Sequence, residues 1–338
     1  MLLAHIADIH FRTPHCLNPA IDPDRPFRTR MIQDIRNRSA GLGSVDALLV
    51  GGDIAFKGNP EEYVTARAWL EEFASACGCP MERVFVVPGN HDVDRAVIAN
   101  STAVRNAQAA IMRSDDRQRE QELRTQFSDT DSGRALVAPL EAYNEFAKFF
   151  DCQIFPPERL YWKQILPLEM GVQLHIHGLT STFLSGSNGE DDTRGTLYLS
   201  PLQTVLDPLD DVINVVLCHH PPSWLLDHDE VDDAIRDRTA IQLFGHEHRA
   251  RIDKGDGFIR CSAGAVNPDR YETGWKPGYN LINVQVSDEN QDRTLEVKVH
   301  VLEWQSNPEL YRPVLSQGDE PVSGILPSAK FPMLRFPA

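Results

Sequence analysis

The stretch Val84-Phe85-Val86-Val87-Pro88-Gly89-Asn90-His91-Asp92 places polar residues directly after an apolar run. A short run of β-branched and aromatic residues that ends at Pro-Gly is typical of a buried strand. The four residues from Gly89 to Asp92 add nothing to an apolar core, yet they hold an amide, an imidazole and a carboxylate. We therefore expect a strand whose carboxyl end opens into a site of chemistry.

Four more polar motifs follow apolar runs elsewhere in the chain: Asp8-Ile9-His10, Gly51-Gly52-Asp53, Cys218-His219-His220-Pro221 and Gly245-His246-Glu247-His248. A single Asp-x-His or Gly-Asp is no more than a polar turn. The last motif is more specific, because imidazoles at i and i+2 of an extended segment lie on one side of it. Ligands in α/β sheets bind outside the carboxyl ends of strands, so we expect the five loops to form one cleft.

The side chains of these loops are a mixed set of oxygen and nitrogen ligands: Asp8, Asp53, Asn90, His10, His219, His246 and His248. Such a set suits divalent Mn, Fe, Co, Ni or Zn. Seven ligands are too many for one catalytic zinc, which uses three. Divided between two cations with one bridging carboxylate, they fit a centre that activates a bridging water for in-line displacement at phosphorus.

The order of apolar segments predicts an α/β protein with two sheets packed face to face and helices outside. The expected strands are residues 2–7, 47–50, 84–87, 172–176, 212–217, 241–244, 258–261, 279–286 and 295–302. Residues 60–77 read as an amphipathic helix between Pro60 and Gly78.

The predicted core comprises residues 1–92 and 172–306, interrupted by a long helical insertion. Residues 93–171 are too long for a simple connection, so we expect a cap of helices over 96–112, the run through 126, and 138–150. Residues 307–338 are rich in proline and are interpreted as an extended arm or a tail.

The five motifs together resemble the signature of the calcineurin-like metallophosphoesterases, over a span from Met1 to about Val286. The His219-His220-Pro221-Pro222 segment and the long insertion look like the branch with class III cyclic-nucleotide phosphodiesterases. The resemblance implies a four-layer α/β/β/α sandwich of two mixed sheets flanked by helices, and a phosphoesterase activity.

The resemblance also implies a role for each motif residue. Asp8, His10 and His248 would hold one cation, Asn90, His219 and His246 the other, and Asp53 would bridge them. His91 would contact the phosphoryl group or protonate the leaving group, and Asp92 would orient His91. Arg95, Lys57 and His220 are weaker candidates for binding substrate, Arg95 as a fork donor to phosphate.

Composition bears on the substrate and the compartment. The 338 residues carry a formal charge of −16, which disfavours non-specific binding of nucleic acid. We expect a phosphodiesterase with two divalent cations, manganese favoured, acting on a small nucleotide-like diester. The alternatives are a DNA or RNA nuclease of the same superfamily, and a subunit that docks a protein partner through the cap or the tail.

The absence of a leader-like segment and of paired Cys-x-x-Cys motifs favours a soluble, cytoplasmic protein without a membrane partner.

Overall fold

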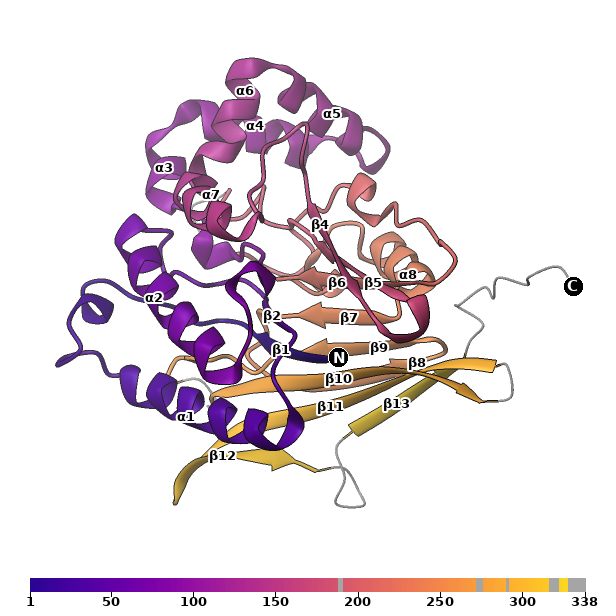
Figure 1. Cartoon of the computed structure of the whole chain (residues 1–338). Coiled ribbons are helices and arrows are strands. Elements are labelled where there is room, and N and C mark those ends of the chain that lie inside the picture. The colour runs from indigo at the N-terminus through magenta and orange to yellow at the C-terminus, as the bar shows by residue number, and fades with distance from the viewer. Residues whose placement is uncertain (188–190, 272–275, 290–291, 316–321, 328–338) are drawn as a thin grey trace, which may run out of the picture.

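Two mixed β-sheets pack against each other through one large hydrophobic core (Figure 1). The computed structural model describes all residues except 188–190, 272–275, 290–291, 316–321 and 328–338. The first sheet has the order β12-β11-β10-β1-β2-β3, with β13 also paired to β11, and the second has the order β4-β5-β6-β7-β9-β8. The predicted fold class, two mixed sheets flanked by helices, is confirmed.

The strands of the first sheet are β1 Leu2–Ile6, β2 Ala47–Val50, β3 Val84–Val86, β10 Gly278–Glu289, β11 Asp292–Ser306, β12 Glu309–Val314 and β13 Val322–Pro327. Those of the second are β4 Trp162–Pro167, β5 Gln173–Gly178, β6 Val212–Cys218, β7 Ile241–Phe244, β8 Arg251–Gly255 and β9 Phe258–Ser262. Each of the nine predicted apolar runs coincides with one of these strands, and three of the runs extend one residue beyond it. The edge strands β4 and β8 were not predicted: β4 interrupts its apolar residues with Lys163 and Gln164, and β8 is largely polar and exposed.

In both sheets the strands that precede the polar motifs run parallel. β1 pairs with β2 and β2 with β3, while β5, β6, β7 and β9 form a second parallel set. A parallel sheet buries both of its faces, which explains the unbroken apolar runs. It also brings the carboxyl ends of neighbouring strands to one edge, where the motifs lie.

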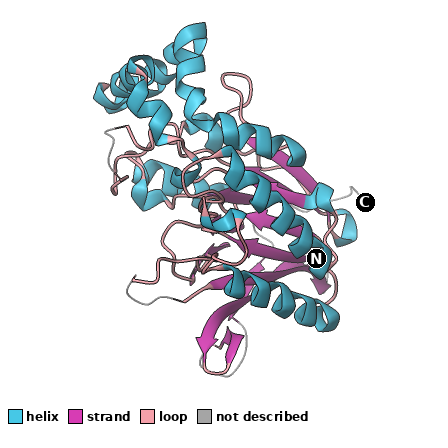
Figure 2. Cartoon of the chain, turned by 90° about the vertical axis from the view of Figure 1, so that its left-hand side faces the viewer, coloured by secondary structure: helices cyan, strands magenta, loops and turns pink. Residues whose placement is uncertain are grey.

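Helices cover the outer face of each sheet (Figure 2). α1 Arg25–Leu42 and α2 Pro60–Cys77 lie over the first sheet and contribute Met31, Ile35, Leu70 and Phe73 to the core. On β6, Val215 and Leu217 face the first sheet, while Val216 and Cys218 form a second cluster with Val231 and Ile235 of α8 His228–Arg238. The order of layers is therefore helix, sheet, sheet, helix.

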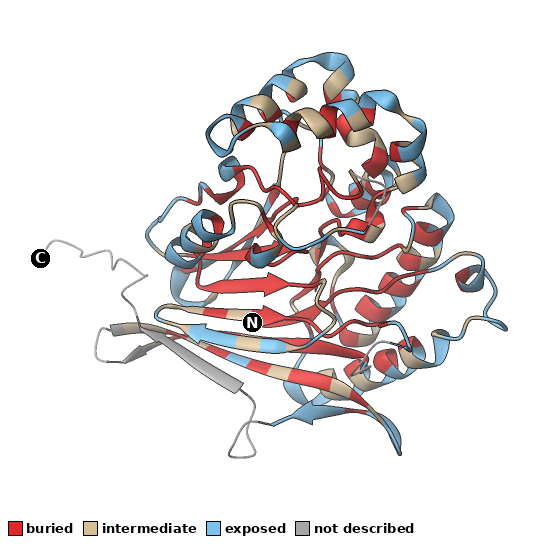
Figure 3. Ribbon diagram, turned by 180° about the vertical axis from the view of Figure 1, so that it is seen from behind, coloured by how far each residue is buried: buried red, intermediate tan, exposed pale blue. Residues whose placement is uncertain are grey.

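Helix α2 begins and ends where its sequence predicts. Asn59 caps the first turn and forms a capping box with Glu62, and Gly78 ends the helix with a φ of 72°. Only glycine adopts that backbone conformation at little cost. Figure 3 shows the burial of the described residues.

The segment predicted as a cap contains five helices at one end of the molecule (Figure 1). They are α3 Arg95–Asn100, α4 Thr102–Arg113, α5 Asp116–Ser128, α6 Thr130–Val137 and α7 Glu141–Ala147. The single helix expected over 96–112 is wrong, since Ser101 accepts a hydrogen bond from Val104 N and starts a new helix. The boundary at residue 171 is also too late, because β4 pairs with β5 as part of the second sheet.

The segment after residue 306 continues the first sheet. β12 and β13 both pair antiparallel with β11, at different parts of that long strand. Residues 328–338 of the predicted arm or tail lie outside the described residues. Among the described residues, no helix has the length and apolarity needed to cross a bilayer.

The two sheets are joined by hydrogen bonds as well as by apolar contacts. The indole Nε1 of Trp162, on β4, donates to the carbonyl oxygen of Val86, on β3, at 2.8 Å, and the Tyr143 hydroxyl donates to the same oxygen at 3.1 Å. Trp162 is 1% exposed and lies directly opposite Gly178 in the β4–β5 ladder. A Cβ at position 178 would lie 1.9 Å from the indole ring.

We predict that Gly178→Ala lowers the free energy of unfolding by about 1–3 kcal/mol, because the buried indole has to move. Gly41→Ala is the matched control: a Cβ there meets no atom within 4 Å, and the residue is helical. Its stability should stay within about 1 kcal/mol of wild type. Urea denaturation of the three proteins measures both effects, and equal stability of all three would contradict the packing described for Trp162.

Candidate metal centre

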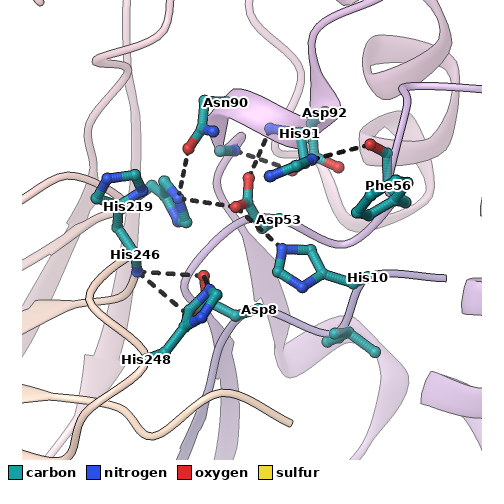
Figure 4. Close-up of polar contacts among 12 residues, drawn as sticks. Asp8, His10, Asp53, Phe56, Asn90, His91, Asp92, His219, His246 and His248 are labelled. Atoms are coloured by element: carbon teal, nitrogen blue, oxygen red, sulfur yellow. Dashed lines mark hydrogen bonds and ion pairs between the residues drawn. The ribbon is translucent and has the colours of Figure 1, made fainter. Parts of the chain in front are cut away.

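The five motifs converge on one site, as Figure 4 shows. Asp8 and His10 follow β1, and Asp53 follows β2. The 3-10 helix Asn90–Asp92 follows β3. His219 and His220 come after β6, and His246 and His248 after β7, so both sheets contribute ligands. Parallel pairing places these strand ends together, as the sequence predicted.

Asp53 lies at the centre of the site. Its Oδ2 is 3.2 Å from Nε2 of His10 and 3.2 Å from Nε2 of His219. Its Oδ1 accepts a hydrogen bond from the backbone N–H of His91 at 2.8 Å. The residue is 1% exposed. One carboxylate therefore faces histidines from both sheets.

Asp8 is the second buried carboxylate of the site. Its oxygens accept hydrogen bonds from the backbone N–H of His246 at 3.1 and 3.2 Å, and Nε2 of His248 lies 3.4 Å from Oδ1. Across the site, Asn90 Oδ1 is 3.2 Å from His219 Nε2 and 3.1 Å from His220 Nε2.

Four groups of three ligand atoms within 4.8 Å of one another could each hold a cation: Asp8, His10 and His248; His10, Asp53 and His91; Asp8, Asp53 and His219; and His219, His220 and His246. The groups overlap, so that Asp8, His10, Asp53 and His219 each belong to two of them. Six of the seven residues predicted as ligands appear in these groups, and the seventh, Asn90, lies beside His219.

The backbone at the site is strained. Among the described residues, eight other than glycine have a positive φ, and five of these are Asp8, His10, Asp53, His246 and His248. A positive φ costs free energy in a residue with a side chain, and such residues cluster where function requires it. At Gly89 a Cβ would lie 2.1 Å from Oδ1 of Asp53, so only glycine leaves room for that carboxylate.

Backbone carbonyls fix the orientation of two ring ligands. Nδ1 of His219 lies 2.7 Å from the Gly51 oxygen, and Nδ1 of His10 lies 3.3 Å from the Asn267 oxygen. A carbonyl only accepts, so each Nδ1 carries a proton and each Nε2 faces the site, where it offers a lone pair to a cation when the ring is neutral. Such bonds to the far nitrogen are typical of histidines that bind metals.

Burial and charge set the protonation of the site. Burial raises the pKa of Asp53, but the charges of His219 and His91 and hydrogen bonds from His10 and His219 outweigh it, and the pKa lies well below its usual value. Burial lowers the pKa of His246 to about 3. Burial also lowers the pKa of His219, but Asp53 reverses this effect and raises it to about 9. The site thus offers ionised carboxylates and one histidine that acts as their counter-ion.

The donor set fits divalent cations. Two buried carboxylates, an amide oxygen and several imidazole nitrogens converge (Figure 4), and histidines are the partners in the ion pairs of Asp8 and Asp53. Buried carboxylates require compensation by positive charge. Mixed nitrogen and oxygen ligands are those of Mn, Fe, Co, Ni and Zn.

His91 is held by Phe56. The ring Nδ1 is 2.9 Å from the Phe56 carbonyl oxygen, and the two rings stack with centroids 4.9 Å apart at 22°. Nδ1 therefore carries a proton, and Nε2 is left to face a substrate. Sequence analysis missed Phe56, because neither a backbone carbonyl nor a single aromatic residue after Asp53 gives a signal.

The predicted role of Asp92 is wrong: none of its hydrogen bonds goes to His91. The carboxylate accepts from the backbone N–H groups of Ile54, Ala55 and Gly89 and from the Tyr63 hydroxyl. These bonds fix the turn that carries Asp53 against the turn that carries Asn90. Burial, and then the charge of Asp53, raise the pKa of Asp92 to about 6.

Glu62 likewise fixes two loops to each other, those after β1 and β2, and sequence analysis also missed this role. It is fully buried, and its carboxylate accepts from the backbone N–H groups of Phe56, Lys57 and Thr13. One side chain of α2 thus joins the loop after β2 to the loop after β1. The capping pattern of α2 was the only sequence signal for this residue.

The three candidates for substrate binding have different positions. Lys57 and Arg95 line a cavity of about 370 Å³ beside Asn90 and His91. Arg95 forms an ion pair with Asp191 at 2.5 Å, and its Nη2 is buried without a hydrogen-bond partner among the described residues. His220 is fully buried and hydrogen bonded to Ser181 and Asn90, so its position is that of a ligand or a neighbour of ligands.

A family comparison matches this site. A sequence model of the calcineurin-like phosphoesterase family matches residues 1–250, about three quarters of the chain. The chain belongs to the calcineurin-like phosphoesterase family. The family uses divalent metals, and the matched span includes all seven residues predicted as ligands, from Asp8 to His248. The finer likeness to the class III cyclic-nucleotide branch stays a prediction.

Individual relatives of this calcineurin-like phosphoesterase are more distant. Glycerophosphodiester phosphodiesterase GpdQ of Enterobacter lignolyticus is 39% identical over 94 residues, which are 27% of this chain and 30% of that protein. Among solved structures, a Vps29 mutant from Entamoeba histolytica matches with a TM-score of 0.38 and 12% identity over 93% of this chain and 98% of its own. GAP50 of Plasmodium matches with a TM-score of 0.46 and 11% identity over 89% and 84%.

We predict that Asp92→Asn lowers the free energy of unfolding by about 2–4 kcal/mol, since the new NH₂ group replaces an acceptor among buried N–H donors. Asp191→Asn, which removes an exposed carboxylate from the Arg95 ion pair, should change it by less than about 1 kcal/mol. Urea denaturation in the presence of a chelator measures both. An Asp92→Asn protein as stable as wild type would contradict the structural role assigned to this carboxylate.

Proposed function

We propose that the chain is a phosphodiesterase that uses two divalent cations, manganese favoured, on a small nucleotide-like diester. The observation that carries the proposal is the overlap of four ligand groups around two buried carboxylates. Asp8, His10 and His248 would hold one cation and Asn90, His219 and His246 the other, with Asp53 between them. Two cations, when bound, would supply activation of water and neutralisation of the phosphoryl oxygens.

The fold holds the proposed ligands in fixed orientations around the reacting phosphate. His10 and His219 each direct Nε2 toward Asp53, and their carbonyl partners prevent the rings from turning. The short turns after β1, β2 and β3 hold Asp8, Asp53 and Asn90 in fixed positions, so little reorganisation accompanies substrate binding. A phosphoryl group bound here would lie beside His91, which lines two cavities.

His91 is the proposed proton donor to the leaving group. Its Nδ1–H donates a hydrogen bond to the Phe56 carbonyl. The proton for the leaving oxygen therefore has to come from Nε2 of the imidazolium form. The stacked Phe56 ring holds the imidazole plane. The geometry therefore allows one direction of proton transfer, from Nε2 toward the open side of the site.

A small diester is favoured over a nucleic acid by the way the cap uses its arginines. Arg119 pairs with Asp116 and Asp227, Arg124 pairs with Glu120, and Arg105 donates to the carbonyl of Ile98. Side chains engaged in this way do not form a basic track for a phosphate backbone. The partial similarity to a glycerophosphodiester phosphodiesterase supports the same choice.

We predict that the purified protein binds about two manganese ions per chain and that Asp53→Asn loses most of this binding, because the shared carboxylate is removed. His228→Ala, at a histidine 56% exposed and outside the four ligand groups, is the matched control and should bind as wild type. Calorimetry and elemental analysis measure the stoichiometry. Full binding by Asp53→Asn would overturn the shared position of this residue.

We predict that His91→Ala retains manganese and that its activity depends on the leaving group. For a diester with an alkyl alcohol as leaving group, kcat should fall roughly 10²- to 10⁴-fold, because the alcohol requires a proton. For bis(p-nitrophenyl) phosphate the loss should be much smaller, since p-nitrophenolate leaves without one. Equal losses on both substrates would remove His91 from the proton-transfer step.

A further inference from the structure

A second cavity, of about 380 Å³, shares only His91 and Phe56 with the cavity that contains Arg95. His10 and His248 line the part of this cavity next to the metal centre, and Arg12 and Phe56 line its outer part. A diester has two arms, and a phosphoryl group beside His91 would have one cavity available for each.

Arg12 is the arginine of this cavity that forms no ion pair with a carboxylate among the described residues. Among the described residues its guanidinium contacts only the Phe56 ring, 3.6 Å from the centroid. The cavity also contains Asp24 and Asp269, but Asp24 pairs with Arg270 at 3.7 Å, and Asp269 accepts from the backbone N–H of Tyr271. An arginine fork binds phosphate or carboxylate through paired hydrogen bonds.

The position of Arg12 is built into the fold. Phe11 and Ala55 form a β-bridge, and the backbone N–H of Phe56 donates to the Phe11 carbonyl. Glu62 accepts from the backbone of Thr13 on one side and of Phe56 on the other. The loop with Arg12 and the loop with Phe56 are therefore held together, and stacking on the ring lowers the entropy that the arginine loses on binding.

The geometry separates Arg12 from the reacting phosphate. A guanidinium 3.6 Å above the Phe56 ring leaves no room for another ring on that face, so His91 stacks on the opposite face. Arg12 is thus one aromatic ring farther out than His91. A cation at that place meets a different part of the substrate from the phosphoryl group that His91 contacts.

We propose that Arg12 binds a second anionic group, a phosphate or a carboxylate, on the arm of the diester that occupies this cavity. The inference rests on the proposed phosphodiesterase function and adds to it a substrate class: diesters with a charge beyond the scissile phosphate. Arg12 acts as a specificity residue, and His91 and the ligand set serve all diesters alike.

The test compares matched substrates with the full-length, manganese-loaded protein. One pair is thymidine 5′-(p-nitrophenyl phosphate) with and without a 3′-phosphate, and the other is p-nitrophenyl carboxymethyl phosphate against its 2-hydroxyethyl analogue. Wild type should have the lower KM for the anionic member of at least one pair, and which pair responds distinguishes phosphate from carboxylate.

Arg12→Gln should raise the KM for that anionic member by about tenfold to a hundredfold, with a much smaller change for the neutral one. Arg12→Lys should recover part of the preference, because it keeps the charge without the fork. Arg36→Gln removes an exposed charge on α1, away from both cavities, and should behave as wild type. Equal KM values for both members of each pair, or equal changes in Arg12→Gln, would overturn the inference.

Binding separates this inference from the proposed function. Calorimetry with thymidine 3′,5′-bisphosphate and thymidine 5′-monophosphate, and with phosphoglycolate and ethyl phosphate, measures the anion preference without turnover. A preference that Arg12→Gln abolishes, in a protein that hydrolyses none of the diesters, would support the anion site and refute the phosphodiesterase. Hydrolysis of all diesters without any anion preference would support the phosphodiesterase and refute the anion site.

Discussion

The burial of the Asp53 carboxylate is the constraint on which the rest of the site depends. A charge that is 1% exposed, close to a second buried carboxylate at Asp8, is stable only beside positive charge. In the chain itself His219 supplies it, with a pKa raised to about 9 by Asp53. Cations would take over this role and release the proton from His219. The positive φ angles at five ligand positions suit the same purpose, since they direct the side chains inward from strand ends.

Two further buried acids hold the loops in place and take no part in the ligand set. Asp92 joins the turns after β2 and β3 through backbone N–H groups, and Glu62 joins the loops after β1 and β2 in the same way. Both replace backbone partners that the irregular turns do not provide. A carboxylate that accepts several bonds can substitute for a stretch of sheet, and this allows the strand ends to diverge into a site without losing rigidity.

The sequence predicted the nine buried apolar strands and the convergence of the five motifs, because both depend on local patterns. Parallel strands such as β2 and β3 are apolar throughout, and each motif follows its strand closely. Contacts between loops were not predictable. The role of orienting His91 was given to Asp92 by the family resemblance, whereas the fold turns its carboxylate toward Ile54 and Tyr63. The edge strand β4 escaped for another reason: its exposed alternate residues resemble a loop.

The charge of the whole chain and the charge at the site have opposite effects on an anionic substrate. A formal charge of −16 repels anions at long range, and a long-range field of this kind acts chiefly on association. Within the cleft, short-range contacts decide. Most arginines of the cap are bound to neighbouring acids or carbonyls, whereas Arg12 is held by an aromatic ring that leaves its N–H groups available. An acidic exterior with a few prepared cations therefore selects for substrates small enough to enter the cleft, because a long polyanion would meet the repulsion along its whole length.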